Sequence, residues 1–143
     1  MAETFELEIA TPERSLVKER AVRAQIPGKD GYFGILPDHA AMVSELGIGT
    51  LSYANSQGGT YVVAIHGGFV EVLDNHVRVL ADIAEPGVEI DVARAERALK
   101  RTTEELENLG EAADPAAALA AVLRAEARIE AARKAQENLG QAR

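Results

Sequence analysis

The sequence predicts an α+β protein organised by domains, in which an N-terminal antiparallel β-sandwich is followed by a C-terminal antiparallel two-helix hairpin. Two observations predict this fold class. Short segments up to Pro86 alternate apolar and polar residues with the period of two that strands have, and beyond Gly87 the apolar residues recur at helical spacing. We therefore expect a sandwich unit over residues 1–86 and a helical unit over residues 87–143.

Residues that favour turns separate the alternating segments of the first unit. The expected strands are 5–9, 22–26, 48–54, 60–65, 69–73 and 76–83. Pro27-Gly28 ends the second of these, residues 55–59 are typical of a hairpin loop, and Asp74-Asn75 is typical of a two-residue hairpin turn. His66-Gly67-Gly68 is interpreted as a turn that follows a strand. Several short strands joined in this way are typical of an antiparallel sandwich or barrel.

A first helix is predicted from Val92 to Leu109. Asp91 precedes it and is of a residue type that caps free amides of the first turn, and Gly110 follows as a residue type that ends helices. One mostly apolar stripe of this helix consists of Ala95, Leu99, Thr102, Leu106 and Leu109. We expect this stripe to face the rest of the protein.

A second helix is predicted to begin at Pro115, with Asp114 as its cap, and to stop at Gly140. Its expected seam is narrow and rich in alanine: Ala118, Val122, Ala125, Ile129, Ala132 and Leu139. The short connection, residues 110–113, favours an antiparallel hairpin. Burying a methyl group contributes about 0.8 kcal/mol, against about 1.5–3 kcal/mol for a whole leucine or isoleucine side chain, so we expect the hairpin to dock weakly. It can then stay helical while its docking changes.

Composition and charge exclude several classes of function. The net charge is −8 and the pI is about 4.9, which disfavours binding to nucleic acid and to anionic lipid head groups. No apolar run approaches the roughly 20 residues of a membrane-spanning helix, so no direct membrane insertion is expected. The chain has no cysteine, which excludes disulfides and thiolate metal sites. Aromatic residues make up 4%, so the core must be mainly aliphatic.

No catalytic or metal-binding motif is complete. Gly28-Lys29 resembles part of a phosphate loop, but Asp30 stands where serine or threonine is needed. A His-Gly-Gly segment at residues 66–68 lacks the Gly-x-Ser-x-Gly turn that accompanies an oxyanion loop in lipases. The histidines, which lack metal-ligand spacing, are His39, His66 and His76. We predict a protein without catalytic residues and without a metal site.

Two segments resemble the signatures of a known family. Residues 31–40 read Gly-Tyr-Phe-Gly-Ile-Leu-Pro-Asp-His-Ala, and residues 67–72, continued by residues 75–81, lead a Gly-Gly-Phe turn into a hairpin. Both resemble segments of the epsilon subunits of bacterial F-type ATP synthases, and the resemblance covers nearly the whole chain in order. It implies a non-catalytic subunit of the central stalk that couples the rotor ring to the gamma subunit in ATP synthesis.

The resemblance implies that the sandwich contacts the gamma subunit and the membrane rotor ring of c subunits. We expect glycines and Pro37 to shape a tight, irregular loop over residues 31–40 that presents His39 at one end of the sandwich. The candidate contact residues are Gly31, Tyr32, Gly34, Pro37 and His39. Many relatives carry an acidic residue in place of Tyr32, so an aromatic contact is expected here instead. The alternative is a turn that only connects strands.

A third segment, residues 90–95, reads Ile-Asp-Val-Ala-Arg-Ala and resembles the motif with which some bacterial epsilon subunits bind ATP. A helix N-terminus followed by an arginine suits a phosphate group. The candidate nucleotide-binding residues are Glu85, Ile90, Asp91, Arg94, Ala95, Arg101 and Arg124. ATP would be a regulatory ligand, and no other cofactor is expected. Ala131 and Ala135 depart from the pattern, because nucleotide-binding relatives have arginines near these positions. The alternative is that Asp91 caps the helix beside a surface Arg94.

The resemblance further implies that the helical hairpin is regulatory. Extended along the gamma subunit, it would reach the alpha and beta subunits of the catalytic head and inhibit ATP hydrolysis. The candidate inhibitory residues are Arg124, Arg128, Arg133 and Lys134. The alternative is a solvated face that pairs locally with Glu126, Glu130 and Glu137. The complex would hold the chain peripherally at the cytoplasmic face of the bacterial cell membrane.

Two other classes of protein fit the residues alone. A free-standing sandwich that binds a ligand would be a monomer without a stalk partner. A small enzyme would use His39 or His66 and would lose activity when that histidine is replaced.

Overall fold

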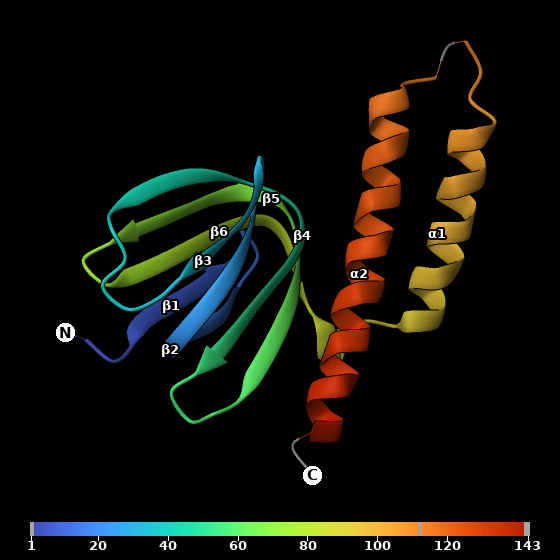
Figure 1. Cartoon of the computed structure of the whole chain (residues 1–143). Coiled ribbons are helices and arrows are strands. Elements are labelled where there is room, and N and C mark those ends of the chain that lie inside the picture. The colour runs from blue at the N-terminus through green and yellow to red at the C-terminus, as the bar shows by residue number, and fades with distance from the viewer. Residues whose placement is uncertain (1, 112, 142–143) are drawn as a thin grey trace.

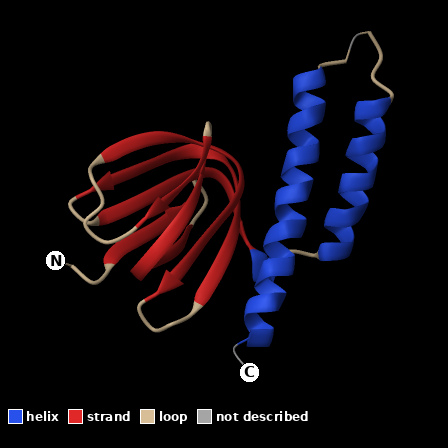
Figure 2. Cartoon of the chain, viewed as in Figure 1, coloured by secondary structure: helices blue, strands red, loops and turns tan. Residues whose placement is uncertain are grey.

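The computed structural model of the chain describes residues 2–111 and 113–141. A twisted β-sandwich stands beside a pair of antiparallel helices, as the ribbons of Figure 1 and Figure 2 show. The strands are β1 (Phe5–Ala10), β2 (Ser15–Gly28), β3 (Gly31–Ile35), β4 (Met42–Asn55), β5 (Thr60–Leu73) and β6 (His76–Pro86). The helices are the short 3-10 helix η1 (Gly87–Glu89), α1 (Val92–Glu107) and α2 (Pro115–Gln141). The predicted fold class is confirmed.

A sheet of six strands closes on itself to form the sandwich. Its order is β1-β6-β5-β4-β2-β3, and β1 also pairs with β2. The pairings among the described residues are antiparallel, except that β1 runs parallel to β6. The parallel pairing was not predicted, because alternation within a strand does not reveal the direction of its neighbour.

The core of the sandwich is mainly aliphatic, as the low aromatic content predicts. On β1, Phe5, Leu7 and Ile9 are at most 1% exposed and alternate with half-buried residues. Burial of side chains of this size contributes about 1.5–3 kcal/mol each. The core cluster lies within residues 5–84 and includes no helical residue. The sandwich therefore completes its core without the helices.

The regular pairing of β4, β5 and β6 is interrupted at one row of the sheet, which contains Gly47, Gly67 and Asp82. The register of the three strands is the same on both sides of this row. Gly67 and Gly68 have φ angles of 75° and 117°, and the core-facing residues of β5 change there from odd to even positions. The predicted turn at residues 66–68 is therefore wrong. The glycines change which side of a continuous strand faces the core, and the chain does not reverse.

The glycine-rich segment that follows β2 is a strand over half its length. β3 pairs with β2 from Ile35, opposite Ala24, to Gly31, opposite Gly28. The predicted irregular loop is therefore wrong for residues 31–35, and irregular structure begins at Leu36. The local glycines indicated turns, but the edge of β2 offers hydrogen-bond partners that sequence spacing cannot show.

The two helices begin where predicted but end elsewhere. The carboxylate of Asp91 accepts a hydrogen bond from the backbone N–H of Arg94 at 3.1 Å, which confirms the cap of α1. α1 ends at Glu107, short of the predicted Leu109, while α2 continues through Gly140, so that predicted stop is wrong. Glycine costs about 1 kcal/mol in a helix, which weakens a helix without ending it. Four residues of the predicted segments lie outside the described residues. Residue 112 belongs to the predicted loop 110–113, residue 1 to the predicted unit 1–86, and residues 142 and 143 to the predicted unit 87–143.

α2 lies between the sandwich and α1 and buries two faces (Figure 1). The buried residues of the predicted seam are Val122, Ala125, Ile129 and Ala132, whereas Ala118 is half-buried and Leu139 is 58% exposed. A second buried stripe consists of Ala127, Ala131 and Ala135. The Ala131 carbonyl lies so close to Gly87 that a side chain at Gly87 would collide with it. Both buried faces of α2 are rich in alanine, so they bury little apolar area per residue.

Candidate functional site

The predicted nucleotide-binding residues come together in a cleft at the start of α1. The cleft measures about 330 Å³, a size typical of small-molecule sites, and lies where β6, η1, α1 and α2 meet. Six of the seven predicted residues line it, namely Glu85, Ile90, Asp91, Arg94, Ala95 and Arg101. Arg124 is not among the lining residues, and Arg128 contributes from α2 instead.

Arg128 is the residue of this cleft that sequence reasoning assigned only to the inhibitory set. Its Nε donates a hydrogen bond to Oε1 of Glu85 at 2.7 Å, and this ion pair ties α2 to β6. Both side chains are about one-third exposed. No local spacing in the sequence links Arg128 to the cleft, because Arg128 joins the other lining residues only where α2 docks on β6.

Three carboxylates, those of Glu85, Glu89 and Asp91, and the guanidinium groups of Arg94, Arg101 and Arg128 line the cleft. Arg14 neutralises Glu89 at 2.9 Å, and Arg128 neutralises Glu85. Within residues 2–111 and 113–141, neither Arg94 nor Arg101 forms an ion pair. Two guanidinium groups are therefore available in the cleft for an anionic ligand.

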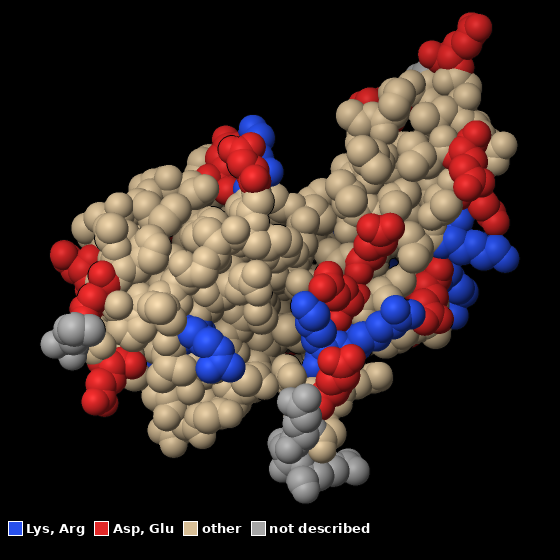
Figure 3. All heavy atoms as spheres, viewed as in Figure 1, with Lys and Arg blue, Asp and Glu red and all other residues tan. Residues whose placement is uncertain are grey.

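The four predicted inhibitory residues do not share one face of α2. Lys134 pairs with Glu130 at 2.9 Å, and Arg133 reaches Glu96 on α1 at 3.9 Å. Arg128 turns toward the cleft instead. On the face shown in Figure 3, basic side chains lie over the half of the hairpin where α1 begins and α2 ends, with acidic side chains among them, and the opposite tip carries acidic side chains.

The structure divides the predicted partner-contact residues between a strand and a loop. Gly31, Tyr32 and Gly34 lie on β3, whereas Pro37 and His39 follow in the loop before β4. The Tyr32 hydroxyl accepts a hydrogen bond from the backbone N–H of Thr50 at 3.0 Å. Tyr32 nevertheless remains 51% exposed, so its ring is available to a partner while its hydroxyl braces β4.

An apolar surface that sequence reasoning did not single out lies on the outer face of the sheet. Phe69 on β5 stands opposite Leu80 on β6 and opposite Glu45 on β4, two residues from Val43. Val43, Phe69 and Leu80 are 71%, 54% and 44% exposed, and we call these three residues the outer patch. Neighbouring exposed apolar side chains are typical of a surface that contacts another protein. Phe69 precedes the core residues Val70 and Val72 in a strand whose side chains alternate between two faces, and this alternation could have revealed the outer patch from the sequence.

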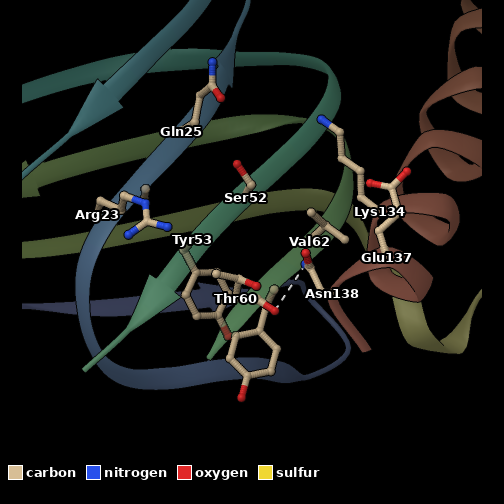
Figure 4. Close-up of a pocket in the computed structure, with 11 residues that line it drawn as sticks. Arg23, Gln25, Ser52, Tyr53, Thr60, Val62, Lys134, Glu137 and Asn138 are labelled. Carbon is tan, nitrogen blue, oxygen red and sulfur yellow. Dashed lines mark hydrogen bonds between the residues drawn. The ribbon is translucent and has the colours of Figure 1, made fainter. Parts of the chain in front are cut away.

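A second hollow, of about 340 Å³, lies between the sandwich and the C-terminal half of α2 (Figure 4). The rings of Tyr53 and Tyr61 stack beside it with centroids 5.2 Å apart, and the side chain of Asn138 donates to the carbonyl of Thr60 at 3.3 Å. Lys134 comes from the helix side of the hollow. Because α2 supplies one wall, this hollow exists only while the helix lies on the sandwich.

Within residues 2–111 and 113–141, no group of three or more histidine, aspartate or glutamate side chains is placed to hold a metal ion. No helix in that part of the chain has the length and apolar character needed to cross a lipid bilayer.

The chain is similar to known proteins over both of its parts. The family model of the beta-sandwich domain of ATP synthase delta/epsilon chains matches residues 4–87. The ATP synthase epsilon chain of Solibacter usitatus is 52% identical over 134 residues, which are 94% of this chain and 99% of that one. The ATP synthase epsilon chain of Syntrophomonas wolfei is 47% identical over 135 residues, with 94% and 98% covered.

Solved structures agree with this similarity. A chain in the structure of the Euglena gracilis mitochondrial ATP synthase, which comprises OSCP, F1 and the c-ring, superposes with a TM-score of 0.80. It is 25% identical, and the match covers 92% of this chain and 82% of that chain. The similarity in structure therefore spans the helices as well as the sandwich.

Proposed function

This chain belongs to the family of ATP synthase epsilon chains, and we propose that its sandwich holds the gamma subunit and the ring of c subunits together as they rotate. The observation that carries this proposal is the 52% identity to an epsilon chain along nearly the whole of both sequences. As an epsilon chain it is a stalk subunit, and the catalysis belongs to other subunits. Its place in the cell follows from these partners: the periphery of the cytoplasmic face of the bacterial membrane.

The outer patch and the loop that follows β3 support a body built for protein contact. Val43, Phe69 and Leu80 expose apolar surface that a partner would cover, and Tyr32 exposes an aromatic ring on β3, the strand that leads into the loop with Pro37 and His39. Neither surface belongs to the sandwich core, so both can be changed with little effect on folding.

Assembly tests this proposal directly. A tagged chain is expected to recover the gamma subunit and the c-ring from detergent-solubilised membranes. Phe69→Asp should lower that recovery about tenfold or more, because a charge would be buried in the contact without a partner. Leu119→Asp on α2, which replaces a side chain of similar exposure, is the matched control and should assemble normally.

Recovery of neither subunit by the unaltered chain would contradict the proposal and favour a free-standing ligand-binding sandwich. Loss of an activity on replacement of His39 or His66, without loss of assembly, would favour a small enzyme.

The cleft at the start of α1 supports regulatory binding of ATP. Arg94 and Arg101 supply positive charge for the phosphates, with Arg128 within reach if it exchanges Glu85 for a phosphate oxygen. Asp91 already caps the helix, so it would contact the ribose or base and not a phosphate. Ala131 is buried next to Gly87, and Ala135 also packs there, so arginines at these positions would not fit this docked form.

Calorimetry with ATP tests the cleft. Arg94→Ala is expected to weaken ATP binding about tenfold or more, since a hydrogen bond to a charged group contributes about 1.5–3 kcal/mol. Arg97→Ala, on the same helix but outside the cleft lining, should leave the affinity unchanged. Absence of heat at millimolar ATP would remove the site from the account.

The hairpin is proposed as the inhibitory element of the complex. In the docked form, Arg128 pairs with Glu85 and Lys134 pairs with Glu130. When the hairpin extends toward the alpha and beta subunits, these basic residues would leave their present partners and pair with acidic groups of the catalytic head. ATP in the cleft would oppose this, because the cleft is shared by β6, α1 and α2 and exists only in the docked form.

A further inference from the structure

His66 is buried beneath α2 in an unusual chemical setting. It lies on β5, opposite Ile48 of β4 and Ile83 of β6, and is 5% exposed. Neither ring nitrogen makes a hydrogen bond to any residue in the described part of the chain. A buried polar group without a partner is costly, and structures retain few of them. The face of β5 that carries His66 is the one that α2 covers, because Glu85, opposite Ala64 on that face, pairs with Arg128.

The charges around His66 come mostly from the helix and are mostly positive. α2 contributes Arg124 and Arg128, and β6 contributes Glu85. Glu85 is already paired with Arg128 at 2.7 Å, and the positive charge of Arg128 offsets the attraction that Glu85 would exert on a second cation. The only charged residue of β4 is Glu45, which pairs with Lys29 at 3.0 Å. Besides Glu85, the carboxylates of β6 and η1 are Asp82, next to Ile83 and close to Gly67, and Glu89, which pairs with Arg14. The carboxylates of α2 are Glu126, Glu130 and Glu137, of which Glu130 pairs with Lys134.

We propose that His66 is a pH-sensitive latch, in which a proton added to its buried imidazole releases α2 from the sandwich. The imidazolium would need water or a carboxylate, and the docked helix offers it an apolar cover and two guanidinium groups. Lifting α2 hydrates the ring and carries both arginines away. The latch concerns docking within this chain, and its effect on rotation rests on the proposed function.

The direction of the pH effect follows from the two protonation equilibria. Burial, and then the charge of Arg128, lower the pKa of His66 from 6.5 to about 4 in the docked form. Once α2 is lifted, the pKa returns toward 6.5, so the undocked form binds a proton more readily. Docking is therefore strongest above about pH 6.5 and is lost as the pH falls toward 4. Between pH 7.5 and pH 5 the ratio of undocked to docked protein should rise about 25-fold.

A distance measurement on the whole chain tests the latch. The protein has no cysteine, so Gln57→Cys in the β4–β5 loop and Gln136→Cys on α2, both exposed, supply unique sites for a pair of spin labels. The ratio of molecules with the lengthened distance to molecules with the short distance should increase about 25-fold from pH 7.5 to pH 5. His66→Gln and His66→Ser should each abolish the increase, because neither side chain titrates. His39→Gln, at a half-buried loop position, should retain it.

Two results would overturn the latch. One is an equal population of the long distance at both pH values in the labelled chain that retains His66. The other is a pH response that persists in both His66 variants. Proton NMR of the imidazoles provides an independent readout: the midpoint for His66 should lie well below 6.5 while the short distance persists. A His66 midpoint near 6.5 with the helix still docked would also overturn the proposal.

Discussion

Ending the chain after Pro86 is expected to raise the rate of ATP hydrolysis by the assembled complex several-fold while the sandwich stays folded. The sandwich should fold because its core cluster lies within residues 5–84, and the outer patch that we propose for assembly is also retained. The rate should rise because the truncation removes both helices, and with them every candidate inhibitory residue. Hydrolysis by purified complexes with full-length and truncated chains measures the effect.

The matched control for this truncation keeps the hairpin but neutralises one candidate. Arg133→Gln changes an exposed side chain whose nearest acidic partner, Glu96, is 3.9 Å away, and should have a much smaller effect than removal of the helices. Equal hydrolysis rates with the full-length and truncated chains, at equal occupancy of the complex, would rule out inhibition by the hairpin. A truncated chain that fails to fold would contradict the independence of the sandwich core.

Gly68→Ala is expected to destabilise the protein by about 3–5 kcal/mol, the range of severe single substitutions. Gly68 has a φ angle of 117°, which side chains of L-residues rarely adopt, and an added Cβ would overlap the carbonyl oxygen of Leu80. That carbonyl belongs to the backbone of β6, so relief would require the paired strands to separate. Thermal unfolding followed by circular dichroism should show a clear drop in the midpoint.

Gly34→Ala provides the control, because an added Cβ there meets no atom within 4 Å and the φ angle is not positive. It should change the unfolding midpoint little. If Gly68→Ala unfolds at the same temperature as Gly34→Ala, the change in the core-facing side of β5 at Gly67 and Gly68 does not require glycine, and our account of this row is wrong.

The parts of the fold that depend on neighbouring residues were predictable from the sequence. The hairpin turn at Asp74-Asn75 has φ angles of 50° and 60°, which aspartate and asparagine tolerate, and it joins β5 to β6 as expected. The cap at Asp91 and the start of α2 at Pro115 are likewise encoded by residues one to three positions away.

The parts that depend on distant partners were not predictable in the same way. Residues 66–68 look like a turn because glycine indicates a positive φ angle and does not tell whether the chain reverses. The second buried stripe of α2 was missed because Ala127, Ala131 and Ala135 are small enough to suit either a buried or an exposed face. The motif at residues 90–95 identified most of the cleft, since those residues are consecutive. Arg128 joins it only through the docking of α2 on β6.

We propose above all that the helices that cover the sandwich in the isolated chain leave it when the complex is restrained. The spin-label pair at positions 57 and 136 measures this most directly in the assembled complex. We predict one short distance with saturating ATP, and a second, longer distance when ATP is replaced by ADP, in complexes whose hydrolysis rate rises on truncation after Pro86. A single short distance under both conditions, in complexes that the truncation activates, would contradict the claim.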